Sequence, residues 1–588
     1  MSGSRPSVQR SPTIAGMFFA VVVLSVVGAC APPSPTGSSS GAAVPAGATS
    51  TRPARTLVAA VRNEPSTLAS LPLGQQGGGA AVYFSKRMFN ADLSILDGDG
   101  VPRPYLAEAL PQLNTASWQV FPDGRMETTH RLKDGVRWHN GNPLTADDFV
   151  FSWRVYATPA FGHANSAPIS LMEDVSAPDP RTIVIKWKAP YPQADTLQNL
   201  GTGAKGLPPL PQAVLGPTFE GQSPEALVNN SFWTQSYIGL GPYRLEQWQP
   251  GAFIEATAFE QPALKTPNIL RIRVLIIPDG NTVLANMVSG DVQLAADVAL
   301  PLGFVPEVMQ AWGPGKGTSL LHLNQWRTAT VQLRPDIVGS QALIDPRVRR
   351  ALAYAVDKEG TNAATWAGQA IPSDVWIAPN SETGRVVDAA ATKYPHDIRL
   401  AEQQMATAGY LRTGSGYAAS NGARVAFDVM TNASPNNESE MSIIAAGWRQ
   451  AGFDVKEAVL PSALGQDNEA RSTFTGIFVA STNVGEQTAV SYATAYLARP
   501  ENRWAGLNRG GYSEPSYDVL VDSLGTTLDR QQRAQLLAQM GKIFTDDLPS
   551  IPVFFQPQPW VFVNELKGLR VAASETNMSW NMREWEFN

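Results

Sequence analysis

The sequence predicts a mixed α/β fold made of two to four structural units, and three observations support this. The chain has 588 residues, several times the roughly 100–150 of a usual domain. Hydrophobic residues make up 43% of it and charged residues 16%, which is typical of a folded chain. Strand-like and helix-like segments alternate from residue 56 onward without a repeat of fixed length, which argues against solenoids and propellers.

The first thirty residues have the pattern of a bacterial lipoprotein signal. Residues 1–29 contain two arginines and no acidic residue, and an apolar run extends from Met17 to Val27, as in a secretory signal peptide. The run ends in VGAC, which resembles a lipobox whose cysteine, Cys30, is acylated. We therefore expect a lipid anchor at Cys30 and an extracytoplasmic mature chain; an ordinary signal peptide and an uncleaved anchor are the alternatives.

Residues 30–54 are predicted to be a flexible tether behind the acylated cysteine. They are rich in Pro, Ser, Gly and Ala, so burial cannot offset the entropy lost on ordering. A random coil of this length would hold the folded part roughly 25–30 Å from the lipid surface. No later segment approaches the ~18 consecutive apolar residues of a membrane span.

The first elements of the folded part follow from local patterns. Residues 57–61, Leu-Val-Ala-Ala-Val, predict a short buried strand, and the three glycines at 77–79 predict a flexible loop. A helix is predicted to begin after Thr145, because Thr145 and Asp148 have the spacing of a capping box ahead of apolar residues.

Two later helices have clear start and stop signals. Asp345 and a following proline begin the first, whose apolar residues recur at helical spacing up to Gly360. Asp529 begins the second, which carries an apolar stripe and stops before Pro549. Two apolar strands are expected after it, at 551–555 and 560–563. The chain therefore begins and ends with strands, as expected if both ends build one domain.

Charge and motif content exclude several classes of protein. The net charge is −6 and no basic run of five residues occurs, so a nucleic-acid partner is not expected. A single cysteine excludes an intramolecular disulfide and a Cys-built metal site. The sequence has no G-x-S-x-G, H-E-x-x-H or G-x-x-x-x-G-K-[ST] motif, and no two histidines lie three or four residues apart. We therefore predict no catalytic residue, no metal site and no cofactor.

An ordered set of motifs covers nearly all of the mature chain. The main ones are RLKDGVRWHNG at 131–141, GLGPYRL at 239–245, IPDGNT at 277–282, DPRVRRAL at 345–352 and IPV at 551–553. The set closely resembles the signature of family 5 solute-binding proteins, the extracytoplasmic receptors of peptide and nickel ABC importers. Each motif also has a structural interpretation: Asp134-Gly135 and Asn140-Gly141 predict tight turns around a short strand that contains a packed Trp138.

The resemblance implies a periplasmic-binding-protein-like two-lobe fold of type II with an extra inserted α/β domain. The ligand would be enclosed between two lobes that close about a hinge. Mapped by motif, the divisions are a signal peptide at 1–29, the lipidated cysteine and tether at 30–54, lobe I at 55–96, 233–325 and 549–588, the inserted domain at 97–232, and lobe II at 326–548.

The resemblance also implies where a ligand would bind. In peptide-binding members an extended peptide exchanges backbone hydrogen bonds with both lobes, in the manner of an added strand. The first-lobe contact would be the segment that contains Gly77, Gly78, Gly79 and Tyr83, where glycines allow a ligand main chain to approach. Candidate wall residues of the second lobe are Trp376, Phe478, Ser481, Asn483, Glu486 and Trp504. For the two tryptophans ordinary packing is the leading alternative.

The sequence departs from peptide-binding members at one place. Such members often carry Gly-Trp followed by an aspartate that pairs with the α-amine of the peptide. Residues 476–486 are GIFVASTNVGE, in which Glu486 is the one carboxylate. Burying an ammonium group without a charged partner would cost several kcal/mol, which weakens the case for capture of an unmodified peptide amine.

The sequence therefore predicts a monomeric, lipid-anchored receptor that captures a peptide or a similar polar solute and delivers it to an ABC permease in the membrane. A surface lipoprotein that keeps the fold but regulates or scaffolds an envelope partner is the alternative. An envelope hydrolase is disfavoured, because nucleophile and metal motifs are missing.

Overall fold

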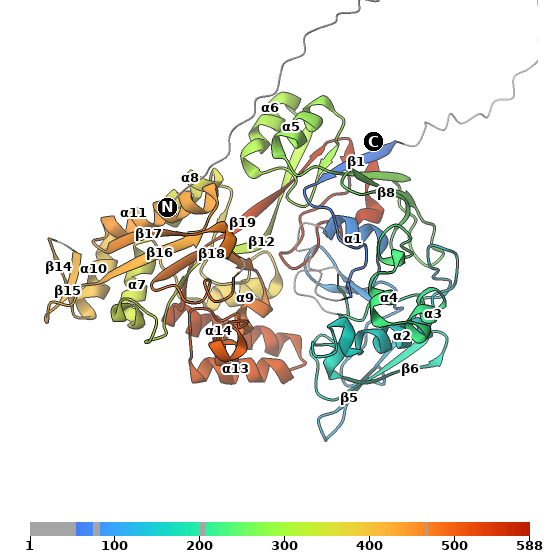
Figure 1. Ribbon diagram of the computed structural model, residues 1–588, viewed down its shortest axis with the longest axis horizontal. Helices are drawn as coiled ribbons and strands as arrows, with labels where there is room; N and C mark the ends of the chain where they lie inside the picture. The colour runs from blue at the N-terminus through green and yellow to red at the C-terminus, as the bar shows by residue number, and fades with distance from the viewer. Residues whose placement is uncertain (1–54, 74–82, 200–205, 415, 466) are drawn as a thin grey trace, which may run out of the picture. The chain divides into compact units, whose positions relative to one another are not determined.

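Two long strands organise the largest sheet of the protein. The computed structural model describes residues 55–73, 83–199, 206–414, 416–465 and 467–588. Strands β12 (Gly317–Val331) and β19 (Ser550–Val563) pair antiparallel over most of their length. They lie in the middle of an 11-stranded sheet of order β17-β16-β18-β12-β19-β11-β1-β10-β9-β8, with β13 paired to β19 (Figure 1).

This sheet is mixed, which confirms the predicted α/β class. β1 is parallel to β10 and β11, β16 is parallel to β17 and β18, and β8, β9 and β10 form an antiparallel meander. The strand predicted at 57–61 is β1. The bounds are β1 (Thr56–Val61), β8 (Tyr243–Gln249), β9 (Phe253–Ala258), β10 (Arg271–Ile276), β11 (Leu294–Ala295), β13 (Ile371–Pro372), β16 (Ala426–Asn432), β17 (Asp454–Leu460) and β18 (Ile477–Asn483).

Buried apolar side chains gather in clusters that divide the chain by sequence. The first core is formed mainly by residues between 57 and 276 and between 560 and 585. The second core is formed by residues between 323 and 555. β12 contributes to both, since Leu320 packs against the first core whereas Trp326 is buried in the second. The two long strands therefore connect the two cores.

The first core includes a separate four-stranded sheet of order β4-β5-β7-β6. Helix α2 packs against β6 and β7 of this sheet (Figure 1). The elements of this part are α1 (Tyr83–Phe89), β2 (Ser94–Leu96), β3 (Pro102–Pro104), β4 (Trp118–Val120), β5 (Met126–Arg131), α2 (Ala146–Tyr156), β6 (Met172–Asp179), β7 (Thr182–Trp187), α3 (Gln212–Gly221), α4 (Pro224–Val228), β20 (Leu566–Lys567) and β21 (Glu586–Phe587). Helices α5 (Gly280–Ser289) and α6 (Val305–Trp312) pack in a separate, smaller cluster.

The second core is covered mostly by helices. Helix α11 packs against β16, β17 and β18, and α14 packs against α9 and α13 (Figure 1). The elements are α7 (Pro346–Tyr354), α8 (Lys358–Trp366), α9 (Glu382–Ala390), α10 (Ile398–Thr407), β14 (Tyr410–Thr413), β15 (Gly416–Ala419), α11 (Pro435–Gln450), α12 (Glu486–Val490), α13 (Pro515–Thr526) and α14 (Arg530–Asp547).

The predicted helix start at Thr145 and the predicted turns beside Trp138 are confirmed. Thr145 is the N-cap of α2, and its capping box with Asp148 is present. Gly135 and Gly141 adopt φ of 75° and 89°, a left-handed conformation that glycine adopts without strain. Trp138 is buried and donates from Nε1 to Asp148 Oδ2 at 3.1 Å. The short strand predicted between the turns is not formed, since Arg137 makes only an isolated bridge with Pro143, but Trp138 fastens this segment to the start of α2.

The two later helices begin where the caps predict, but one of them ends early. Asp345 caps α7 and Asp529 caps α14, which stops before Pro549 as expected. The first helix, whose apolar residues from Val348 to Val356 were expected to end before Gly360, stops slightly sooner than expected. Helix α7 ends at Tyr354, and Asp357 caps a new helix, α8, by accepting from the N–H of Gly360 at 2.8 Å. A second capping aspartate therefore starts another helix within the same apolar pattern.

The expectation of two separate strands near the C-terminus is also wrong. β19 is one continuous strand that runs through Pro552, Pro557 and Pro559. Proline is tolerated in a strand where its nitrogen faces no partner. In the described part of the chain, the edge of β19 opposite β12 is paired only near its ends, by β13 at Phe554 and Phe555 and by β11 at Val561 and Phe562. Between Phe555 and Val561 the strand can carry Pro557 and Pro559 without losing ladder bonds on this edge. Pro552 lies before these points and faces Thr328 of β12 next to a shift in register.

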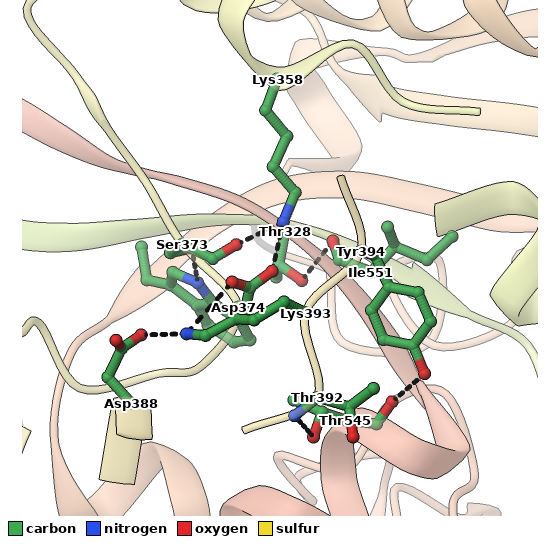
Figure 2. Close-up of polar contacts among 11 residues, drawn as sticks. Thr328, Lys358, Ser373, Asp374, Asp388, Thr392, Lys393, Tyr394, Thr545 and Ile551 are labelled. Atoms are coloured by element: carbon green, nitrogen blue, oxygen red, sulfur yellow. Dashed lines mark hydrogen bonds and ion pairs between the residues drawn. The ribbon is translucent and has the colours of Figure 1, made fainter. Parts of the chain in front are cut away.

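A buried charge network stabilises the second core (Figure 2). Lys358 of α8 donates from Nζ to Asp374 Oδ1 at 2.6 Å and to the Ser373 carbonyl at 2.7 Å. Lys393 lies 3.3 Å from Asp374, and Trp326 of β12 donates to Ser373 Oγ at 2.8 Å. Burial lowers the pKa of Lys358, whereas Asp374 opposes this shift. Because the charges are paired with one another, the network connects α8 to β12 and is not a ligand site.

Candidate functional site

A pocket of about 140 Å³ lies against β18 and β12. Thr328 and Thr330 of β12 line it, together with Phe478, Ala480 and Thr482 of β18. The register pairs Thr328 with Ala480 and Thr330 with Phe478, and alternate residues of a strand share one face. The floor is therefore one face of the sheet, and residues within 471–474, 488–492 and 507–512 complete the wall. We call this the β18 pocket.

The loop that covers the pocket is held by side-chain hydrogen bonds to its backbone. Asn508 donates from Nδ2 to the carbonyls of Tyr492 and Tyr512 at 2.9 and 2.8 Å, and it accepts from the Tyr512 N–H at 3.1 Å. Arg334 donates to the carbonyls of Ala498 and Arg509 at 2.8 and 3.0 Å. The pocket wall is therefore fixed by groups whose own hydrogen bonds are satisfied.

A buried ion pair lies at the end of the pocket floor. Arg327 of β12 donates from Nε to the Glu440 carboxylate at 3.0–3.1 Å, and the two side chains are 4% and 1% exposed. Arg327 Nη1 also donates to Ser481 Oγ at 2.7 Å. Burial raises the pKa of Glu440, whereas Arg327 lowers it. The pair thus connects α11 to β12 and holds the Ser481 side chain in place.

The structure brings two of the predicted wall residues together in the pocket. Phe478 and Ser481 both line it. Asn483 does not, and it accepts from Gln325 Nε2 at 3.2 Å near the end of β18. Trp504 is half-buried outside the pocket, with the Arg334 guanidinium 5.1 Å from its ring centroid. The predicted site is therefore represented in the pocket by residues of β18 alone.

Trp376 is a core residue and does not line the pocket. Its side chain is fully buried in the second core, with its ring centroid 4.7 Å from that of Phe544 in an edge-to-face arrangement. Its proposed role as a ligand wall is corrected by this packing, which was the leading alternative. Tyr83 begins α1, where burial and the nearby Asp297 raise its pKa. Gly77, Gly78, Gly79 and Cys30 lie outside the described residues.

Glu486 joins a polar cluster formed by segments far apart in the sequence. Its carboxylate forms an ion pair with Arg533, and its N–H donates to Glu575 Oε1 at 3.3 Å. Nearby, Arg530 is paired with Asp195 at 2.8 Å. Burial and the charge of Glu486 raise the pKa of Glu575 to about 7. This cluster, which we call the bridging cluster, joins α12 and α14 to residues near 195 and 575.

Two arginines of the β18 pocket were not predicted from the sequence. Arg471 and Arg509 line the pocket from the segments before and after β18. Neither belongs to a motif, and 38 residues separate them in the chain. Only the folded structure shows that the two arginines lie on one wall of the pocket.

Across the described ranges, no group of three or more His, Cys, Asp or Glu side chains is arranged to hold a metal ion. No helix in the same part of the chain is both long and apolar enough to cross a membrane.

The fold matches solved structures over nine-tenths of the chain. NikZ from Campylobacter jejuni, in complex with Ni(L-His), has a TM-score of 0.66 at 21% identity and covers 90% of this chain and 99% of its own. AppA from Bacillus subtilis, in complex with a nonapeptide, has a TM-score of 0.64 at 19% identity and covers 91% and 99%. The substrate-binding protein CtaP from Listeria monocytogenes has a TM-score of 0.71 at 19% identity and covers 91% and 99%. The fold is therefore that of a periplasmic-type solute-binding protein.

Sequence comparisons identify the family. Oligopeptide-binding protein OppA of Bacillus subtilis is 22% identical over 515 residues, covering 81% of this chain and 84% of OppA. The probable deoxycholate-binding periplasmic protein YgiS of Escherichia coli is 25% identical over 488 residues, covering 79% and 81%. The model of bacterial extracellular solute-binding proteins, family 5, matches residues 108–502. The chain belongs to this family, whose members are binding proteins.

Proposed function

We propose that this protein is the substrate-binding component of an ABC importer and that it captures a peptide or a similar polar solute. The observation that carries the proposal is the family match over residues 108–502, because it includes the strands β12 and β18 that form the floor of the β18 pocket. Relatives named for oligopeptide binding, such as OppA, support a peptide-like solute. The same relatives favour capture for transport over the regulatory or scaffolding alternative.

We further propose that the two cores belong to two lobes. Lobe I would comprise 55–96, 233–325 and 549–588, the inserted domain 97–232, and lobe II 326–548. The two cores support this division for most of the chain, except that residues 551–555 pack in the second core. The position of the four-stranded sheet within 97–232 supports the inserted domain. On this assignment the bridging cluster consists of contacts between lobe II and the rest of the protein.

The sequence supports a lipid anchor at Cys30 and an extracytoplasmic location. The apolar run from Met17 to Val27 followed by Cys30 has the order of a lipoprotein signal. A folded monomer tethered through residues 30–54 would deliver its solute to a permease in the same membrane. Mass spectrometry of the membrane-extracted protein tests this part, since lipidation adds acyl mass at Cys30 and removes residues 1–29.

Ligand capture is tested on the mature chain carrying Cys30→Ser, which prevents lipidation. Thermal shift and native mass spectrometry are measured with pools of short peptides, with sugars and with nickel. A ligand at a hundredfold excess over its Kd stabilises the folded state by about 2.7 kcal/mol, which a thermal shift detects. We expect a shift with peptides. No shift with any pool, together with no co-purified mass, would favour the regulatory alternative.

Closure of the lobes is predicted to depend on pH through Glu575. When the lobes separate, the Glu575 carboxyl is hydrated and its pKa returns toward 4.5, whereas it is about 7 in the bridging cluster. Between pH 4.5 and 7 the closed form binds a proton at Glu575 that the open form does not. Acid therefore favours closure, so ligand affinity is highest below pH 4.5 and falls as the pH rises to 7. Because Glu575 retains some exposure, we expect about a tenfold decrease in affinity between pH 5 and 8.

The matched variant for this prediction is Glu575→Gln, which keeps the shape and can still accept from the N–H of Glu486. Its affinity for the same ligand is expected to lack this pH dependence. The other ionisable groups of the cluster are Glu486, Arg533, Arg530, Asp195 and Tyr191, and all remain in the variant. Calorimetric titration at pH 5, 6, 7 and 8 makes the comparison. Equal pH dependence in both proteins would show that Glu575 is not the group responsible.

A further inference from the structure

Arg471 and Arg509 differ from the other charged residues around the β18 pocket in having few partners. Both line it, and both have a buried Nε atom without a hydrogen-bond partner. Among the residues that the structure describes, no acidic side chain forms an ion pair with either arginine, and no aspartate or glutamate lines the pocket. Their neighbour Arg334 differs, because its guanidinium donates to several backbone carbonyls.

An unpaired buried guanidinium is unfavourable unless something binds it. Each guanidinium is partly buried and therefore loses some of its hydration without gaining an acidic partner. Burial lowers the pKa of Arg471, and burial together with the charge of Arg471 lowers the pKa of Arg509 to about 10. The two positive charges therefore destabilise each other in the empty pocket, and a bound anion would relieve both costs.

The remainder of the wall suits an anion with an apolar stem. Phe478 and Leu507 provide apolar surface. The hydroxyl groups of Thr328 and Ser491 already donate to the carbonyls of Ile551 and Thr488, at 3.1 and 2.7 Å, so the two guanidinium groups are the donors that the pocket offers to an anion. Both arginines are partly exposed, so the pocket can be entered from solvent. A volume of about 140 Å³ suits one end or one side chain of a solute and not a whole oligopeptide.

We propose that the β18 pocket is an anion subsite in which Arg471 and Arg509 bind a carboxylate or a phosphate group of the captured solute. The planar guanidinium fork matches either group by two parallel hydrogen bonds. This inference rests on the proposed capture of a solute and specifies its chemical class: the solute is anchored by its negative charge. Among the described residues that line the pocket there is no carboxylate that could pair with a peptide amine, in agreement with the sequence of residues 476–486.

The test compares four tripeptides by calorimetric titration into the Cys30→Ser mature protein. Ala-Gln-Ala-amide has no anionic group; Ala-Gln-Ala with a free C-terminus, Ala-Glu-Ala-amide and Ala-phosphoserine-Ala-amide each have one source of negative charge. Citrate and inorganic phosphate are titrated as non-peptide anions. We expect at least one anion to bind ten times more tightly than Ala-Gln-Ala-amide. The anion with the lowest Kd shows whether the subsite prefers a carboxylate or a phosphate.

Arg471→Gln and Arg509→Gln are expected to weaken binding of that anion at least tenfold and to leave any binding of Ala-Gln-Ala-amide unchanged. Arg503→Gln is the matched control, because Arg503 is exposed on the same covering loop and does not line the pocket. A second measurement separates a ligand site from a structural role: without ligand, both pocket variants should melt at or above the parent temperature, since an unpaired charge has been removed. If an arginine instead stabilises the fold, its substitution would lower the melting temperature.

The outcomes separate this inference from the proposed function. If Ala-Gln-Ala-amide or another solute without an anionic group binds as tightly as every anion, solute capture stands and the anion subsite is wrong. Retention of the preference in both pocket variants, or melting temperatures well below the parent's, also overturns the subsite. If neither these probes nor the wider pools of peptides, sugars and nickel bind, the proposed function itself fails.

Discussion

Arg327→Met is expected to lower the free energy of unfolding by about 3–5 kcal/mol, because it leaves the Glu440 carboxylate buried without its charged partner. Both side chains are almost inaccessible to solvent, at 4% and 1%. The same change removes the hydrogen bond to Ser481 Oγ. Burial already raises the pKa of Glu440, so the variant will keep Glu440 protonated over a wider pH range than the parent does.

The double variant Arg327→Met/Glu440→Leu provides the control for this prediction. It replaces both charges by apolar groups of similar size, and such replacements of a buried pair are often neutral or stabilising. We expect it to recover most of the loss. Lys542→Met is the surface control, since its pair with Asp546 has side chains 52% and 39% exposed and such pairs contribute about 0–1 kcal/mol.

Urea unfolding at pH 7 measures all three variants and the parent, with the midpoints compared at a common slope. A loss below about 1 kcal/mol for Arg327→Met, similar to that expected for a surface pair, would mean that water enters around Glu440 in the folded protein. The pair would then not contribute to the second core in the way that its burial indicates.

Local signals in the sequence predicted local structure well. Thr145 with Asp148, Asp345 and Asp529 cap the helices that they were expected to cap, because a helix N-terminus is fixed by residues within one turn. The end of α7 was not predicted, because the apolar period continues into α8, which begins after its own N-cap, Asp357. β19 was divided in two because its prolines indicate breaks, and only the pairing with β12 shows that it is continuous.

The candidate site was predictable only where it follows a motif. Phe478 and Ser481 were found through the resemblance of the segment around β18. Arg471 and Arg509 carry no such signal, since their importance comes from the absence of acidic partners in space. The pairing of Arg327 with Glu440 spans 113 residues, and no spacing rule reaches that far. Trp376 was a weak candidate because a tryptophan packs in a core more often than it lines a ligand site.

Relative to the parent, His139→Gln is expected to gain about 3 kcal/mol in free energy of unfolding as the pH falls from 6.5 to 4.5, because the variant lacks the histidine whose titration destabilises the folded state. The ring is 4% exposed; Nδ1 accepts from the Gly239 N–H at 3.1 Å and Nε2 donates to the Gly241 carbonyl at 3.1 Å. A protonated ring could not accept from Gly239. Burial accordingly lowers the pKa of His139 to about 3, from 6.5.

The sign of the pH effect follows from which state binds the proton. Below pH 6.5 the unfolded chain protonates His139, whereas the folded chain does not until about pH 3, so stability decreases by about 1.4 kcal/mol per pH unit on acidification. Asp92, Asp297 and Glu575 act in the opposite direction, because burial raises their pKa to about 7 and the folded chain binds protons first. Total stability thus combines both effects, and only the difference between variant and parent isolates His139.

The measurement is urea unfolding of parent and His139→Gln at pH 6.5, 5.5 and 4.5. At pH 6.5 the variant should be less stable by about 1–2 kcal/mol, because a buried hydrogen bond is lost, and this deficit should shrink and reverse by pH 4.5. Gln261→Ala is the matched control: Gln261 accepts from the Arg137 N–H at 2.9 Å beside the same turn and does not titrate, so its deficit should be the same at each pH. A constant deficit for His139→Gln as well would show that the folded protein protonates His139 as readily as the unfolded chain, and that its two backbone hydrogen bonds do not hold the ring neutral.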